Sequence, residues 1–286
     1  MNVEPAAPGR IAIRRQVERL RELPTLPAVV ERIAQALEQP NVNLGEVATL
    51  IEADQVLTAH LLRLANSAFY GVSGQIASVT RALTILGTAI TRSLLYGVSV
   101  LDLRIDLAGF WEHSIGTALA AGALAKHLRL RAPEEVSGAG LLHDLGKVVL
   151  YKQAPEMFAA VVERAAAEGL HFADAERALL GVDHSEVASW LLARWRFPDR
   201  LLEPVVHHHA PERARVAPVE TAVVHVANTL VRAYGYGFGG DRRIPTISRG
   251  AWKLLGLNAA ALDAVIASFE ADLRAAHEAE GVQATG

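Results

Sequence analysis

The chain has 286 residues, no cysteine and a formal net charge of −3 at pH 7. The absence of cysteine excludes disulfides and thiolate zinc sites, and the charge gives no general attraction to nucleic-acid backbones. Hydrophobic residues make up 51% of the chain, no run reaches the roughly 18 apolar residues that span a bilayer, and the first ten residues hold no apolar signal segment. We therefore expect a cytoplasmic protein with sizeable cores and no membrane contact.

Helical spacing dominates the first half. Residues 1–22 are expected to form a tail or helix whose arginines make a solvated face or, less favoured, a surface for an acidic or peptide partner: Arg10, Arg14, Arg15, Arg19 and Arg21. Asn43 has the position of an N-cap for a helix over 44–51, with Glu46 three residues on as in a capping box. Ser78 is expected to open another helix through Leu86. These signals predict an N-terminal helical bundle over residues 23–105.

The stretch from Val98 to Leu107 is ambiguous. Its leucines and isoleucine alternate with other residues at positions 101, 103, 105 and 107, which is a strand pattern, although both flanks have helical spacing. We interpret it as a connector between two halves.

Beyond this connector the spacing predicts a second helical half over residues 106–276, followed by a disordered tail over 277–286. The expected helices are Trp111–Leu128, Ser137–Tyr151, Pro155–Glu168, Asp174–Leu180, His184–Trp195, Pro218–Tyr234 and Ala259–Ala276. The glycine-rich segment from Tyr234 to Arg243 is expected to be a loop. It lacks the spacing of a phosphate-binding loop. The fold class is therefore all-α.

Several histidines fall at positions where a surface histidine would be unusual. His143 and Asp144 lie within an apolar run, and a carboxylate in such a place must be paired or bound to a cation. The other inward candidates are His113 and His184 on apolar helix faces, His208 and His209 near a helix end, and Asn228 three residues after His225. One such histidine is more often a hydrogen-bonded core residue than a ligand. Neutral imidazoles that converge with a carboxylate are instead the ligands that a transition metal prefers.

These residues also carry a family resemblance. The run from Gly140 to Lys147, Gly-Leu-Leu-His-Asp-Leu-Gly-Lys, resembles the signature of the HD superfamily of helical metal-dependent phosphohydrolases. The motifs Leu23-Pro-Thr-Leu-Pro, Ile51-Glu-Ala-Asp, Leu61 to Gly71, Ile76 to Ser78 and Leu86-Gly87 are similar to the HDOD (HD-related output domain) family. This resemblance runs from Leu23 to about Pro211. It implies an HD-like helical bundle preceded by an N-terminal helical bundle, and an output or adaptor role in bacterial signal transduction.

The resemblance also implies a ligand set. The positions that match the superfamily's metal-binding residues are His113, His143, Asp144, His184, His208, His209 and, in place of an aspartate, Asn228. Most HDOD members lack part of this set, whereas this chain keeps most of it. It departs from the HD-GYP branch, because the GYP motif is missing and Gly109 stands where that branch has a glutamate.

Two functions follow. Because Asp144 is the one matched carboxylate, one ion at His113, His143, Asp144 and Asn228 is easier to sustain than a second at His184, His208 and His209, which would need an external anion such as phosphate. We favour a non-catalytic signalling module with signalling proteins as partners. The alternative is a phosphohydrolase acting on a nucleotide or cyclic dinucleotide. One or two divalent ions (Fe, Mn, Zn or Ni) are expected.

If the chain is an enzyme, the candidate catalytic residues are Asp144, in the metal site that activates water, and Lys147, near the phosphate. The interpretation favoured for Lys147 is nevertheless an exposed cation on a helix surface.

Overall fold

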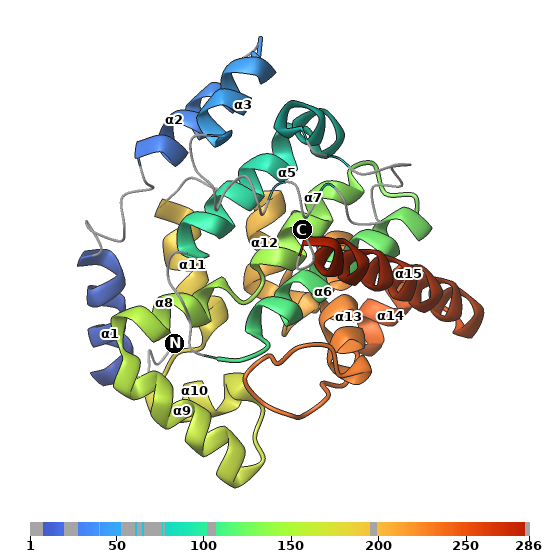
Figure 1. The fold of residues 1–286 in the computed structure, drawn as a ribbon. Helices are drawn as coiled ribbons and strands as arrows, with labels where there is room; N and C mark the ends of the chain where they lie inside the picture. The colour runs from blue at the N-terminus through green and yellow to red at the C-terminus, as the bar shows by residue number, and fades with distance from the viewer. Residues whose placement is uncertain are drawn as a thin grey trace.

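The structure is a computed structural model that describes residues 8–19, 28–39, 41–52, 61, 65, 76, 78–101, 107–194 and 199–283. All regular secondary structure in these ranges is helical, as predicted (Figure 1). In chain order the helices are α1 (Pro8–Arg19), α2 (Ala28–Leu37), α3 (Leu44–Glu52), α5 (Val79–Leu101), α6 (Phe110–His127), α7 (Pro133–Leu142), α8 (Leu145–Gln153), α9 (Pro155–Glu168), α10 (Phe172–Leu180), α11 (His184–Arg194), α12 (Asp199–His207), α13 (Pro218–Tyr234), α14 (Arg249–Leu255) and α15 (Ala259–Gln283), with a short 3₁₀ turn, η2 (Pro211–Arg213), after α12.

Two hydrophobic clusters hold these helices together. The smaller one is built from α2, α3 and the first part of α5, and the larger one from α6 to α15. Helix α7 joins them, since it packs on both α5 and α6 and its Leu141 contacts the smaller cluster. Helix α1 packs with the larger cluster: its Ile13 and Val17 are buried there. The larger cluster surrounds every histidine and carboxylate that the sequence singled out as a ligand.

Several local predictions are confirmed. The Asn43 side-chain oxygen accepts from the backbone N–H groups of Gly45 and Glu46, which makes Asn43 the N-cap of α3. The loop from Gly235 onward connects α13 to α14, and it runs at the bottom of Figure 1. Trp195, the expected end of the helix that begins at His184, lies outside the described residues.

Other predictions were wrong. The connector expected over residues 98–107 begins later than predicted, because residues 98–101 continue helix α5, and 102–106 lie outside the described residues. The helix expected over 137–151 is two helices, α7 and α8, interrupted at His143 and Asp144. Helix α15 continues to Gln283, into the range expected as a disordered tail, because the residues after Ala276 include good helix formers such as alanine and glutamate. The α12 and α14 bounds were not predicted.

Among the described helices, no single one is long and apolar enough to cross a membrane. Helix α14 and residues 259–274 meet those requirements only as a pair, bent by 87°.

A carboxylate on α15 gives a prediction about stability. Asp272 is 4% exposed, and burial raises its pKa to about 6 against the opposing effect of Lys126 on α6. An acid whose pKa is raised on folding stabilises the protein below its unfolded pKa, and that stability is lost as the pH rises through the folded value. Between pH 4.5 and 7.5, wild type should therefore lose about 2 kcal/mol of unfolding free energy relative to Asp272→Asn. Urea unfolding of both proteins at the two pH values tests this, and parallel pH dependence would contradict it.

Candidate metal centre

The ligand candidates reach one region of the larger cluster from five places in the chain. His113 lies on α6, His143 and Asp144 lie between α7 and α8, and His184 is the first residue of α11. The remaining candidates are His208 and His209, directly after α12, and Asn228 on α13. A side chain at Gly146, in the first turn of α8, would clash with the His184 backbone, so glycine at this position lets α8 and α11 approach each other directly.

His113, His143 and Asp144 form the first group. The Nε2 atoms of the two histidines are 3.2 Å apart, and Asp144 Oδ2 lies 3.3 Å from His143 Nε2 and 3.7 Å from His113 Nε2. Ligand atoms of a tetrahedral ion with bonds of about 2.0–2.1 Å are separated by about 3.4 Å. The three atoms therefore have the spacing that a divalent transition metal requires, and all three side chains are buried.

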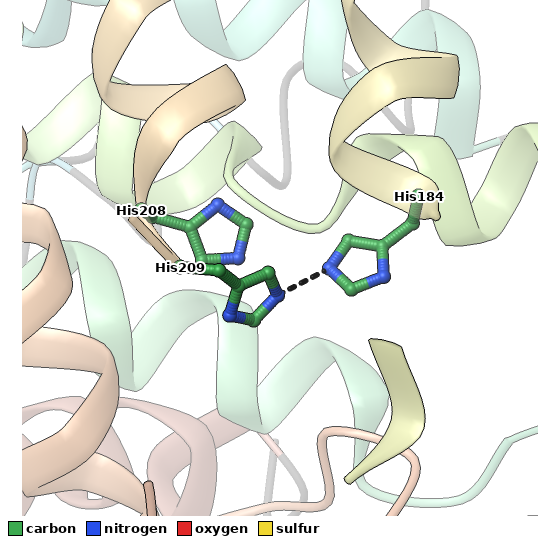
Figure 2. A group of neighbouring side chains, drawn as sticks. All are labelled: His184, His208 and His209. Carbon is green, nitrogen blue, oxygen red and sulfur yellow. Dashed lines mark hydrogen bonds between the residues drawn. The ribbon is translucent and has the colours of Figure 1, made fainter. Parts of the chain in front are cut away.

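His184, His208 and His209 form the second group, shown in Figure 2. The Nε2 atoms of His184 and His209 are 2.9 Å apart. The other oxygen of Asp144, Oδ1, lies 3.2 Å from His184 Nε2 and 3.9 Å from His208 Nε2. Asp144 thus faces the first group with one carboxylate oxygen and the second group with the other.

Hydrogen bonds on the far side of two rings fix which nitrogen faces the centre. His143 Nδ1 is 2.7 Å from the Gly140 carbonyl oxygen, and His208 Nδ1 is 2.7 Å from the Val205 carbonyl oxygen. A carbonyl only accepts, so each Nδ1 carries a proton and each Nε2 presents a lone pair to the centre. Metal-binding histidines in proteins are held in this way.

The electrostatics favour neutral rings beside an ionised carboxylate. Burial, followed by the neighbouring histidines, lowers the pKa of His113, His208 and His209 well below the ordinary value. Burial alone would raise the pKa of Asp144, but His143 and Lys147 outweigh it and hold that pKa well below the usual range. At neutral pH these residues are therefore in the protonation states that bind metal ions.

Polar atoms without hydrogen-bond partners point to a missing ligand. The buried side-chain atoms without a partner among the described residues include four that belong to ligand candidates: His113 Nδ1, Asp144 Oδ1, His208 Nε2 and Asn228 Oδ1. Leaving buried polar atoms unpaired is costly, and the last three of these four are potential metal-binding atoms. The donor set and its spacing fit a divalent transition metal. The roles of the seven candidates as ligands remain predictions, and Asn228 is placed with the second group by the pocket that it lines together with His184, His208 and His209.

Sequence analysis missed a second carboxylate. Glu176 on α10 is fully buried, and its Oε2 lies 2.5 Å from His184 Nδ1 and 2.9 Å from the His184 backbone nitrogen. Burial would lower the pKa of His184, but Glu176 outweighs it and the pKa is raised to about 9. The signal was a glutamate on the apolar face of the expected helix 174–180, a position that a carboxylate occupies only with a partner.

The expectation that Lys147 is exposed was wrong. Its side chain is 1% exposed, and Nζ donates to Asp144 Oδ2 and to the Gly239 carbonyl oxygen, both at 2.6 Å. The ammonium also lies 5.0 Å from the centre of the Phe172 ring. The partner Gly239 lies in a loop 92 residues away along the chain, which local periodicity cannot reveal.

The second group opens into a pocket of about 270 Å³. Its wall includes Lys147, Asn228 and Arg232, and Arg232 is held by a buried ion pair to Asp241. Asp241 also accepts from the Phe172 backbone nitrogen at 2.8 Å, so it ties the α13–α14 loop to α10. The loop whose glycines looked unremarkable in the sequence thus forms one side of the pocket.

Comparison with known proteins gives the family. The family model for the HDOD domain matches residues 23–211. The chain belongs to the HDOD domain family. An uncharacterized protein from Treponema pallidum (strain Nichols) is 30% identical over 224 residues, which are 75% of this chain and 43% of that protein. The chain thus spans less than half the length of that relative.

Solved structures share the fold. An HDOD domain protein of unknown function from Geobacter sulfurreducens has a TM-score of 0.67 at 30% identity, covering 95% of this chain and 94% of that one. A candidate phosphohydrolase from Shewanella amazonensis has a TM-score of 0.69 at 22% identity, with 93% and 97% covered. A candidate signal transduction protein from Marinobacter aquaeolei VT8 has a TM-score of 0.70 at 23% identity, with 96% and 66% covered. The last two likenesses show the fold alone.

Proposed function

We propose that this chain is a signalling module of the HDOD family that binds one or two divalent transition-metal ions, iron, manganese, zinc or nickel, in its helical core. Signalling proteins are the expected partners. Membership of the HDOD family supports the signalling role. The observation that carries the metal role is the position of Asp144, whose two oxygens face two separate groups of imidazoles.

Phosphoester hydrolysis is the second candidate function, with a nucleotide or cyclic dinucleotide as substrate. It is favoured by the same carboxylate: a group that faces two metal sites can bridge them, and bridged pairs of ions serve hydrolysis of phosphoesters. A bound divalent ion would lower the pKa of a coordinated water and polarise a phosphoryl oxygen. The pocket beside the second group provides space for a ligand, and Lys147 and Arg232 bring positive charge to its wall.

Glu176 changes the charge balance at the second group. Counted on sequence alone, Asp144 was the one carboxylate available for both ions. Glu176 adds a second negative charge through its hydrogen bond to His184, although it makes no direct contact with a metal position. An ion at His184, His208 and His209 is therefore less dependent on an external anion than the sequence indicated.

Elemental analysis of the purified, tag-free protein tests the metal role. We expect one or two equivalents of a transition metal in wild type and less than a tenth of that in Asp144→Asn, because the substitution removes the one charge shared by both groups. Asp263→Asn is the matched control, since Asp263 is exposed on α15, does not line the pocket beside the second group, and should leave the metal content unchanged. Equal metal in Asp144→Asn and wild type, or none in either after reconstitution, would contradict the proposal.

A phosphodiesterase screen with manganese, iron, nickel and cobalt separates the two functions. Turnover that requires added metal and is lost in Asp144→Asn would establish hydrolysis. Metal-loaded protein that hydrolyses none of the substrates leaves the signalling module as the function.

A further inference from the structure

Helix α1 precedes the family-matched residues, which begin at 23, yet it packs on the second half of the fold. It lies along α8, α10 and α11, at the left edge of Figure 1. Ile13 and Val17, one helical turn apart, are 1% and 3% exposed and belong to the larger core cluster. Helix α1 therefore covers a face of the larger core cluster that the family-matched residues alone would leave exposed.

Polar contacts also hold α1 against α11. Arg10 forms an ion pair with Glu186, and the Arg14 guanidinium lies 5.7 Å from the centre of the Trp190 ring. Both partners are on α11, one turn apart on the same face of the helix. The face formed by α8, α10 and α11 is therefore an apolar surface bordered by a carboxylate and an aromatic ring. Such a surface is suited to a basic amphipathic helix.

Docking of α1 is a balanced process. A helix of 12 residues is marginal in water when alone, so α1 is helical because it is docked. Its contact is narrow: Ile11, on the same helix, is 44% exposed, and Arg15 is also exposed. Two buried aliphatic side chains must offset the ordering of the whole helix, which places docked and released states close in free energy.

The face formed by α8, α10 and α11 is directly connected to the second group of histidines. Helix α11 begins at His184, and the Arg10 partner Glu186 is in its first turn. Helix α10, also contacted by α1, carries Glu176, which holds the His184 ring. Helix α1 therefore clamps the two helices whose relative position sets the direction of His184 Nε2.

We propose that the face formed by α8, α10 and α11 is a docking surface for a basic amphipathic helix, that α1 of the same chain occupies it, and that docking and metal binding at His184 strengthen each other. The second part rests on the proposed metal site. Coupling of this kind is reciprocal: if docking tightens metal binding, metal binding must tighten docking by the same factor.

Limited trypsin digestion of the full chain measures docking, because α1 carries cleavable arginines that are protected only while the helix is docked. Ile13→Asp should speed cleavage after Arg10, Arg14 and Arg15 at least tenfold. Ile11→Asp is the matched control, the same substitution at an exposed position of the same helix, and should stay within twofold of wild type. Val17→Ala, a milder change, should give an intermediate rate and keeps the test valid if Ile13→Asp unfolds the protein. Equal rates in all four proteins would overturn the docking.

The coupling is read in the same assay with saturating Zn²⁺, with trypsin activity normalised on a small synthetic substrate and bound zinc measured on each sample. Zinc should slow cleavage of α1 about fivefold in wild type and leave His184→Ala unchanged. Bound zinc without slower cleavage would overturn the coupling but not the metal site. No bound zinc would overturn both, while the Ile13→Asp and Ile11→Asp comparison still decides the docking. Protection that grows with protein concentration would mean that α1 of a second copy occupies this surface, and would overturn the assignment to α1 of the same chain.

Discussion

The metal-free protein should lose about 3 kcal/mol of unfolding free energy as the pH rises from 6.5 to 9, and Glu176→Gln should remove most of this loss. The cause is His184, whose pKa Glu176 raises from the ordinary 6.5 to about 9. A base whose pKa is raised on folding contributes stability that is fully present below its unfolded pKa. That contribution disappears as the pH rises through the folded value.

Glutamine at position 176 separates charge from shape. Its amide oxygen can still accept from the His184 backbone nitrogen and from Nδ1, so the packing of α10 against α11 is retained. The charge that outweighs burial is lost, so the pKa of His184 should fall below 9 and its stabilising effect between pH 6.5 and 9 with it. Asp144 Oδ1, 3.2 Å from His184 Nε2, keeps part of the effect in place.

Urea unfolding in the presence of a chelator, at half-unit steps from pH 6 to 9.5, measures this dependence. Glu163→Gln, at an exposed position on α9, is the control for loss of one glutamate charge and should follow wild type. NMR titration of the His184 ring gives the pKa directly. A wild-type stability curve that is flat between pH 6.5 and 9 would show that His184 is not a charged residue in the metal-free fold.

The same proton links pH to metal binding. A metal ion at His184 must displace the Nε2 proton, so affinity at the second group should rise with pH up to about 9 and level off above it. The first group has no such competitor, because burial and His143 already lower the pKa of His113. Two classes of site with different pH dependence are therefore expected in a titration with zinc.

Sequence reasoning succeeded where residues that begin or end helices mark the helix bounds locally. Pro155–Glu168 and Pro218–Tyr234 were predicted with the bounds that the structure shows. Each helix has a proline at its first position and is followed by a glycine in the left-handed conformation, Gly169 or Gly235. These residues fix helix ends locally, so no knowledge of the tertiary fold was needed.

It failed where the deciding partner is remote. The apolar run around His143 has helical spacing throughout, yet the helix breaks at His143 and Asp144, whose side chains contact His113 on α6 and His184 on α11. The seven ligand candidates could be chosen from residue type and family resemblance. Their division into a group with His113 and a group with His184 was also expected from the sequence. The position of Asp144 between the two groups, the place of Asn228 beside the second group, and the part of Glu176 depend on how α10, α11 and α12 converge, and spacing along the chain contains no information on that.

Asp144→Ala should destabilise the metal-free protein by about 3–5 kcal/mol, the range for removing one partner of a buried charge pair. The substitution leaves the Lys147 ammonium in the core with the Gly239 carbonyl as its remaining hydrogen-bond partner among the described residues. A buried cation without a counter-charge is costly, whereas its removal together with the carboxylate is not. Asp144→Ala combined with Lys147→Met should therefore recover most of the lost stability.

The four proteins of this double-mutant cycle, unfolded by urea in a chelator, give the interaction energy, which we expect to be at least about 2 kcal/mol. Asp174→Ala, which removes a half-exposed carboxylate from a surface ion pair, should cost less than about 1 kcal/mol and serves as the control. Additive effects in the cycle would mean that Lys147 does not depend on Asp144. A large interaction energy together with loss of metal in Asp144→Ala would mean that one carboxylate serves both the stability of the core and the binding of the ion. This double role would explain why an ionised aspartate is retained at a position that is 2% exposed.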